Sequence, residues 1–383
     1  MSSNNLKSIK WKFLIKDLLG LSRFQTQKNS IHLKEAGDWL MRAQDATADR
    51  GVSRTFNLRS GWEPSYPETT GYIIPTLIDY AKFTGNDEYK RGALEMADWE
   101  VDIQLDCGGI QAGTIAASPK TPTIFNTGQV LFGWVSAFKQ TGEGKYHKAA
   151  TRAANWLLDV QEPDGSWVRF ASPFARFKRN TYNSRTAWGI YQVYQITENS
   201  KYLDASVKNI RYVLKRQNPQ GWFENNCLED NSLPLTHTIG YTLEGLLGVG
   251  IPLGEQSFID AAETTARALI EVQAKNGSIP GCLDSEWHPG VRWICLTGLA
   301  QIAVCWWRLY QITNHSAYRE AALKANQYLK STQNLSSAVQ GIRGGIKGSH
   351  PISGKYCSYS YPNWAAKFFM DSLLLEEAHS LSH

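Results

Sequence analysis

Long hydrophobic runs are missing from this sequence. No stretch reaches the about 18 to 20 apolar residues that a transmembrane helix requires, which argues against a membrane-spanning protein. The N-terminus also lacks the uninterrupted apolar block and the small-residue cleavage site of a signal peptide. We therefore expect a cytoplasmic protein.

Cysteine is sparse and shows no pairing pattern. The six cysteines form no CxxC pair and no spacing typical of zinc, so the sequence predicts reduced, mostly buried thiols and indicates no metal and no cofactor. They are Cys107, Cys227, Cys282, Cys295, Cys305 and Cys357.

Dense clusters of lysine and arginine are absent as well. The formal net charge of +5 is mild. It favours an anionic partner, but no cluster is dense enough for a nucleic-acid groove, so we expect no nucleic acid to bind. With 42% hydrophobic and 20% charged residues, the chain has the composition of a folded protein with a large core.

Aromatic residues, in contrast, are abundant. The 14 tryptophans and 17 tyrosines exceed what a core normally requires. Such a surplus suits a ligand that stacks on flat faces, for example a sugar, and it equally suits a large helical core built around indoles.

The first 30 residues form a separate basic segment before the main domain. Residues 8–24 carry apolar side chains on one helical face and basic side chains elsewhere. The pattern fits a helix that docks on the protein's own body, which we favour, and it also fits a peripheral helix on the anionic inner face of a membrane. The apolar residues are Trp11, Leu14, Ile15, Leu18 and Leu19, and the basic residues are Lys10, Lys12, Lys16 and Arg23.

A repeat of 56 to 60 residues runs through the rest of the chain. Six amphipathic stretches end in glutamine, four of these glutamines are followed four residues later by glycine, and five have an aromatic residue five positions before them. The glutamines are Gln44, Gln104, Gln161, Gln217, Gln273 and Gln333. A second aromatic series, Tyr89, Tyr146, Tyr202, Phe258 and Tyr318, keeps nearly the same spacing.

Each unit is predicted to contain two helices. One is apolar almost all round, as in GQVLFGWVSAF, and must be buried, whereas the other has a single apolar stripe, as in KYHKAATRAANWLLDVQ, and must lie outside it. The chain opens with a lone outer helix at 31–44 and ends with a lone inner helix, WAAKFFMDSLLLEEA. If these two pair, residues 31–383 form one all-α domain: a closed (α/α)6 toroid of six inner and six outer helices.

At this point the sequence resembles the α/α-toroid superfamily. The stretch WLLDVQEPDGSW, residues 156–167, is similar to the QW motif of terpene cyclases. The count of six units is more similar to the sugar-active toroids, which are glycosidases, polysaccharide lyases and uronate epimerases. The DxDD acid motif of squalene-type cyclases and the zinc ligands of protein prenyltransferases are absent, which disfavours those activities.

The function is expected in the long connections between outer and inner helices, because the inner-to-outer turns are short. In the toroid, all long connections lie at one end, where six inner helix N-termini favour an anionic ligand. Arginine and indole side chains on these loops suit an acidic oligosaccharide. The long connections are 45–69, 105–125, 162–183, 218–236, 274–294 and 334–361.

One candidate chemistry is proton abstraction next to a uronate carboxylate, by a lyase or a C5-epimerase. His237 and Tyr241 in THTIGY share a face at the start of an inner helix, whose dipole keeps the histidine neutral. Asn226 and Arg185 are candidates to hold the carboxylate. The resemblance to toroid lyases implies a set of Tyr, His, Asn and Arg residues. Alternatively, His237 has a purely structural role and caps the start of its helix.

A second candidate chemistry is glycoside hydrolysis by paired carboxylates. Glu63 or Glu68 of the first loop could face Asp284 or Glu286 of the fifth across the mouth, although Glu68 in PETTGY could simply cap its helix. Glu68 and Glu286 are the preferred catalytic pair.

The first long loop ends in GWEPSYPETTGY, residues 61–72, which we expect to form a wall of the sugar site. A third possibility is a non-catalytic sugar-binding component of a polysaccharide assembly system. The expected substrate-binding residues are Trp62, Tyr66, Arg185, Asn226, Trp222, Trp287, Arg292, Tyr361 and Asn363.

Overall fold

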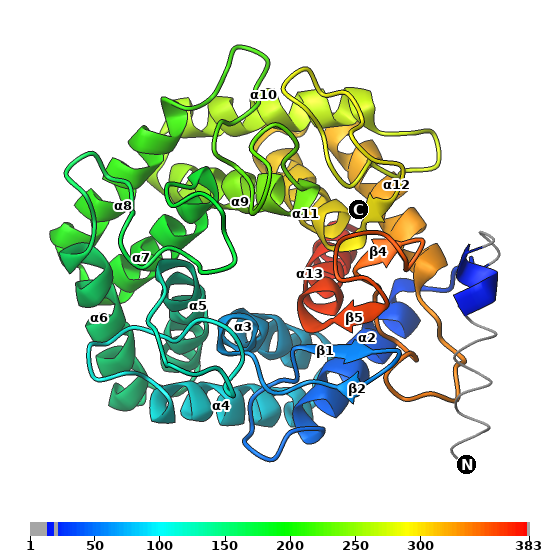
Figure 1. Ribbon diagram of the computed structural model, residues 1–383, viewed down its shortest axis with the longest axis horizontal. Coiled ribbons are helices and arrows are strands. Elements are labelled where there is room, and N and C mark those ends of the chain that lie inside the picture. The colour runs from blue at the N-terminus through cyan, green and yellow to red at the C-terminus, as the bar shows by residue number, and fades with distance from the viewer. Residues whose placement is uncertain (1–13, 19–21, 381–383) are drawn as a thin grey trace.

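A computed structural model describes residues 14–18 and 22–380 of the chain. Between residues 22 and 380, twelve α-helices alternate between an inner and an outer ring (Figure 1). The inner helices are α3 (Pro67–Thr84), α5 (Ile124–Thr141), α7 (Ser184–Thr197), α9 (Thr236–Leu253), α11 (Leu296–Thr313) and α13 (Asn363–Ser380). The outer helices are α2 (Asn29–Asp45), α4 (Asp87–Asp102), α6 (Gly144–Asp159), α8 (Ser200–Leu214), α10 (Gln256–Val272) and α12 (Ser316–Thr332). The protein is thus an α/α toroid, as the sequence predicts.

The two helix types differ in burial as their sequences require. In α5, the residues from Ile124 to Val135 are all buried, because this helix has neighbours on every side. In α6, only a stripe is buried, which includes Ala149, Ala153 and Leu157, and the rest faces solvent. The inner helices approach one another closely: a Cβ on Gly133 of α5 would meet the carbonyl oxygen of Gly71 on α3 at 2.5 Å.

The repeated glutamine joins each outer helix to the next one. The Gln161 side-chain amide donates to the carbonyl oxygens of Gly165 and Ala205, at 3.2 and 3.0 Å, and Ala205 belongs to the following outer helix α8. The other five glutamines make the same type of contact, with Gly92, Ala149, Ala261, Ala321 and His32. The last of these bonds runs from Gln333 to His32 of α2, so it closes the ring.

The repeated glycine allows this contact to form. Gly277 has a positive φ of 89°, which disfavours any residue with a Cβ. A Cβ there would also collide with the carbonyl oxygen of Lys324 on the next outer helix. The sequence repeat therefore records the contact between neighbouring outer helices.

The first and last helices of the ring meet as the sequence predicts, since α2 packs against α13. Short strands, which the sequence analysis did not predict, reinforce the closure. Strand β1 (Thr55–Asn57) of the first long loop pairs with β2 (Gly61–Trp62) and, in antiparallel register, with β5 (Ser360–Pro362) of the last. A second pair joins β3 (Ile294–Cys295) to β4 (Ser349–His350).

The two ends of the toroid differ in their connections. Each of the five inner-to-outer turns has two residues, such as Gly142 and Glu143 between α5 and α6. The long outer-to-inner loops gather at the opposite end, and one of them contains the short 3-10 helix η1 (Thr181–Asn183). All six cysteines are unpaired. None of the described helices is long and apolar enough to span a bilayer.

The N-terminal segment contacts the body differently from the predicted arrangement. Ile15 and Leu18 of the expected docking face are 55% and 49% exposed, whereas Asp17 is buried. Asp17 forms an ion pair with Lys347 and lies 3.6 Å from His350. Leu14 of the predicted face packs against the core, and the buried ion pair of Asp17 holds this turn together with it. Residues 8–13 and 19–21 of the predicted helix lie outside the described residues, and contact with a membrane remains an expectation.

Candidate active site

A cavity of about 360 Å³ lies at the end of the toroid where the long loops gather. Its walls come from the first turns of inner helices and from five of the six long loops. They include Arg54, Tyr66, Glu68, Thr114, Phe125, Phe174, Tyr182, Leu228, His237, Tyr241, Tyr356 and Trp364. Three predicted catalytic residues, Glu68, His237 and Tyr241, therefore line one cavity although they are far apart in the sequence.

Glu68 is the acidic side chain of this cavity. It lies in the first turn of α3, and its Oε2 accepts a hydrogen bond of 2.7 Å from the Tyr66 hydroxyl. Burial raises the pKa of Glu68 to about 7, although the Tyr66 hydrogen bond and the nearby Arg185 and Arg54 lower it in part. This carboxyl group can therefore release or take up a proton near neutral pH.

His237 is held in one neutral form by a chain of buried polar groups. Arg185 donates through Nε to Glu244 Oε2 at 3.0 Å, and the Gln301 side-chain nitrogen donates to the same oxygen, also at 3.0 Å. The Gln301 oxygen must then point the other way, where it lies 2.5 Å from His237 Nδ1. Because a carbonyl oxygen can only accept, Nδ1 carries the proton and Nε2 keeps its lone pair.

The electrostatics agree with this assignment. Burial lowers the pKa of His237 to about 3, and the positive charge of Arg185 lowers it further, while the Gln301 hydrogen bond opposes both. His237 is therefore a neutral base at physiological pH. No hydrogen bond joins its Nε2 to any residue in the described part of the chain.

Tyr241 packs against the histidine with a distance of 4.3 Å between ring centroids. Its hydroxyl lies 3.3 Å from the hydroxyl of Tyr72. Burial raises the pKa of Tyr241 well above its usual value, and the charge of Glu68 adds to this. Tyr241 therefore stays protonated and serves as a hydrogen-bond donor rather than as a base.

Arg54 supplies a cation to the cavity wall. Its Nη1 lies 3.1 Å from Glu63 Oε2, and the guanidinium lies 5.8 Å from the centre of the Tyr66 ring. Aromatic side chains form much of the remaining wall, and the Trp364 indole donates to the Tyr356 hydroxyl at 2.8 Å. Phe125, Tyr182 and Trp364 were not predicted from the sequence, and Arg54 and Tyr356 were noted on the loops but not selected as site residues. A search of the first turn of every inner helix would have found Phe125 and Trp364.

Several predicted binding residues support the walls instead of lining them. Trp62 packs on Trp39 and Phe56, with centroid distances of 5.2 and 5.1 Å, so it does not face the mouth as expected. Asn226 accepts a 3.0 Å hydrogen bond from Thr242. The other buried members of this group are Trp222, Tyr361, Asn363, which donates to the carbonyl of Ser53, and Arg185, which lies beneath Tyr241.

The fifth loop does not reach the cavity. The side chain of Glu286 is 77% exposed, and Arg292 is exposed as well. The Trp287 indole donates to the carbonyl of Gln220 at 2.9 Å, which holds the loop against the neighbouring fourth loop and away from the axis. The expected pairing of Glu68 with Glu286 or Asp284 across the cavity is therefore wrong. Among the described residues, no three His, Cys, Asp or Glu side chains lie together in a way that could hold a metal ion.

Comparisons with known proteins agree on the fold. A family model described as the squalene-hopene cyclase C-terminal domain matches residues 121–247, which span α5 to α9. This segment contains the QW-like stretch. The matched segment, 121–247, is a third of the chain. A search of curated proteins found no match.

Among solved structures, an unsaturated glucuronyl hydrolase specific for heparin is similar with a TM-score of 0.73 at 15% identity, over 91% of this chain and 97% of that one. A second such hydrolase, from Bacillus sp. GL1 and responsible for glycosaminoglycan degradation, has a TM-score of 0.71 at 12% identity, over 92% and 97%. A polysaccharide lyase has a TM-score of 0.64 at 14% identity, over 93% and 98%. At these identities the similarity establishes the toroid fold.

Proposed function

We propose that the protein is a carbohydrate-active enzyme that acts on a uronate-containing glycan by proton transfer at the carbon next to the carboxylate. The observation that carries this proposal is the pairing of Glu68 and His237 in one cavity. Their environments push the two pKa values apart, to about 7 and about 3. One group is thereby a proton donor and the other a proton acceptor at the same pH.

The proposed reaction starts at C5 of the uronate ring. The Nε2 lone pair of His237 removes the C5 proton, and the electron pair of the broken bond is delocalised into the carboxylate. The cation of Arg54 and the hydroxyl of Tyr241 stabilise the additional negative charge. In a lyase, Glu68 then donates its proton to the glycosidic oxygen that leaves C4. In an epimerase, Glu68 instead returns a proton to C5 from the opposite face.

The surroundings of the acid–base pair support a sugar substrate. Aromatic faces such as those of Phe125, Tyr182 and Trp364 suit sugar rings, and the cavity has the volume of a small-molecule site. The names of the structurally similar proteins point to glucuronyl residues and to polysaccharides. Both observations favour an acidic glycan.

A second candidate is hydrolysis of an unsaturated glucuronyl residue, as in the names of two similar structures. A single carboxyl group with a pKa near 7 suits protonation of a carbon–carbon double bond. A hydrolase with paired carboxylates is less well supported, because Glu286 is exposed and does not line the cavity that contains Glu68. Binding of a sugar without catalysis is the remaining alternative.

One assay separates these activities. The purified protein is incubated with polyuronates and, separately, with unsaturated uronyl disaccharides, while ultraviolet absorbance is recorded. A rise with the first substrate indicates a lyase, and a fall with the second indicates hydrolysis of the unsaturated sugar. Deuterium incorporation at C5 without an absorbance change indicates an epimerase. Binding of these glycans without any of the three changes would contradict the enzyme proposal.

A further inference from the structure

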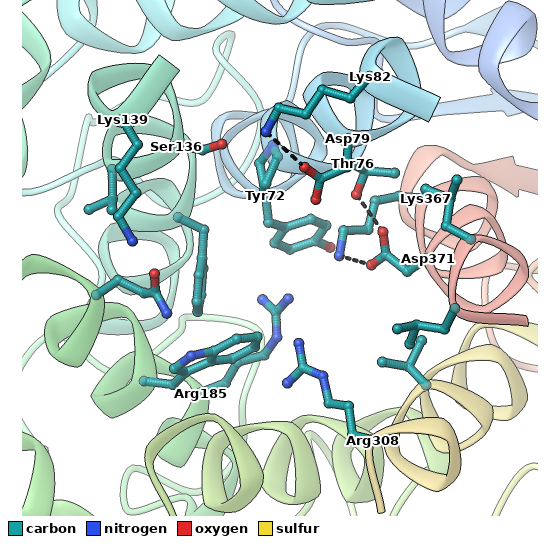
Figure 2. A pocket seen from close by; sticks show the side chains of 18 of the residues that line it. Tyr72, Thr76, Asp79, Lys82, Ser136, Lys139, Arg185, Arg308, Lys367 and Asp371 are labelled. Atoms are coloured by element: carbon teal, nitrogen blue, oxygen red, sulfur yellow. Dashed lines mark hydrogen bonds and ion pairs between the residues drawn. The ribbon is translucent and has the colours of Figure 1, made fainter. Parts of the chain in front are cut away.

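A second cavity, of about 480 Å³, opens near the short-turn end of the toroid (Figure 2). Five basic side chains line it, against two acidic ones, and they come from five of the six inner helices. The basic residues are Lys82, Lys139, Arg185, Arg308 and Lys367, and the acidic residues are Asp79 and Asp371. The cavity therefore carries an excess of positive charge.

This cavity is separate from the candidate active site. The two share no lining residue. Between them lies the guanidinium of Arg185, surrounded by the rings of Tyr72, Phe132, Tyr241 and Phe368 at 4.8 to 5.3 Å. Tyr241 belongs to the active-site cavity, whereas Tyr72 lines the second cavity. A ligand in one cavity is thus kept apart from the other by this aromatic layer.

Two of the cations have no acidic partner. Lys82 lies 3.4 Å from Asp79, and Lys367 pairs with Asp371. Arg308 and Lys139, in contrast, form no ion pair with any residue in ranges 14–18 and 22–380, and Lys139 makes only a long hydrogen bond of 3.4 Å to the side-chain oxygen of Gln195. The guanidinium of Arg308 lies 4.5 Å from the centre of the Trp188 ring, and in Figure 2 it points toward the cavity.

Arg185 is a third cation of this cavity, and one of its donor nitrogens is unused. Its Nε pairs with Glu244 and its Nη1 contacts Gln129, but the second terminal nitrogen, Nη2, has no hydrogen bond within the described parts of the chain. The side chain is only 2% exposed. In Figure 2 the heads of Arg185 and Arg308 lie near each other and point into the same space. Glu244 balances the charge of Arg185, but Arg308 has no carboxylate partner among the described residues, so the two groups together keep a positive charge that favours an anion.

The inner helix dipoles do not explain this charge. Lys82 and Lys139 lie in the last turns of α3 and α5, where the negative dipole end favours a cation. Arg185, however, lies in the first turn of α7, where the dipole disfavours one. Burial lowers the pKa of Lys367, and the charge of Arg185 contributes to the shift. The cations are therefore gathered at an electrostatic cost that a bound anion would relieve.

We propose that this cavity binds a phosphorylated small molecule, whose phosphoryl oxygens are held by Arg308, Lys139 and Nη2 of Arg185. A phosphoryl group carries up to two negative charges and three acceptor oxygens, which matches several cationic donors better than a single carboxylate does. The volume is in the range of small-molecule sites. This inference does not depend on the reaction at the other end of the toroid.

The test is isothermal titration calorimetry of the full chain with inorganic pyrophosphate and with inorganic phosphate, at matched ionic strength. We expect saturable binding at one site, weakened at high salt because the contacts are ionic. Arg308→Gln and Lys139→Gln should each weaken it by about tenfold or more, which is the loss expected for one charge-assisted hydrogen bond. The control Arg319→Gln, on the exposed face of α12, should leave it unchanged.

Three results would overturn the proposal: no saturable binding of either phosphate probe, equal affinity in both cavity variants, or tighter binding of glucuronate than of pyrophosphate. If Arg308→Gln does not fold, Lys139→Gln decides, because Lys139 is exposed at the cavity rim. Glu68→Gln should bind pyrophosphate normally. Loss of the proposed glycan activity and loss of this site are therefore distinguishable.

Discussion

Nδ1 of His237 lies 2.5 Å from Oε1 of Gln301, on the neighbouring inner helix. The contact is informative because the other end of the Gln301 amide donates to Glu244, which pairs with Arg185. A buried ion pair thereby determines which nitrogen of His237 carries the proton. The proposed base depends on residues that never touch the cavity.

This relationship predicts the effect of Gln301→Met. The substitution removes the acceptor that keeps the proton on Nδ1, so part of the His237 population would protonate Nε2 and lose its basic lone pair. We expect kcat to fall by about 10- to 100-fold, the range of a positioning contact, with little change in KM. Steady-state kinetics on the substrate identified by the absorbance assay will measure both.

Gln129→Met is the matched control. Gln129 also contacts Arg185 in this buried layer but does not contact His237. It should lower thermal stability without the selective loss of kcat. If both variants lose activity equally, Gln301 has no specific role in orienting the histidine.

A second prediction concerns the pH dependence of activity. Glu68 must be protonated to act as the acid, and its pKa is raised to about 7. The value of kcat/KM should therefore decline above about pH 7, and Glu68→Gln should abolish turnover while glycan binding persists. Kinetics across pH 5 to 9 together with calorimetry will check this. Glu229→Gln, an exposed position on the fourth long loop and outside the cavity lining, should keep the profile of the wild type.

A third prediction concerns stability. Glu100 on α4 is fully buried, and neither carboxyl oxygen has a hydrogen-bond partner in the described structure. Burial raises its pKa well above the usual 4.5, and Asp49 adds to the shift. A group whose pKa is raised on folding contributes stability below its unfolded pKa and loses it as the pH rises toward the folded pKa.

Glu100→Met should therefore raise the melting temperature, and the gain should be larger at pH 8 than at pH 4. An unpaired buried polar group costs about 1–3 kcal/mol, which corresponds to a few degrees. Thermal unfolding followed by circular dichroism at the two pH values is the measurement. The exposed Glu95→Met on the same helix is the control, and an equal gain for both variants would rule out the buried carboxyl as the cause.

A fourth prediction tests the meaning of the repeat. Gln161→Leu removes the two hydrogen bonds that the side-chain amide donates to the carbonyl oxygens of Gly165 and Ala205, and leucine offers these oxygens no donor in its place. We expect a loss of about 1–3 kcal/mol in the free energy of unfolding. Chemical denaturation will measure it. Gln256→Leu, which removes an exposed hydrogen bond to Asp260, should cost much less.

The candidate site was only partly accessible from the sequence. Glu68, His237 and Tyr241 were found because the toroid must place the first turns of inner helices at one mouth. Glu286 was misplaced, because a loop residue follows its own contacts, and the bond from Trp287 to Gln220 directs that loop away from the axis. Trp62 was misplaced for a similar reason, since Trp39 offers it an apolar surface.

By itself, the sequence determined the helices, their order, the number of units and the closure of the ring. These features depend on local periodicity and on a contact between successive units, such as the bond from Gln161 to Ala205, so they leave a regular spacing. Tertiary structure alone decided which side chains share a cavity. The basic cavity gathers Lys82, Arg308 and Lys367 from three helices that are distant in the chain, because only the curvature of the ring brings the inner faces of those helices to a common axis.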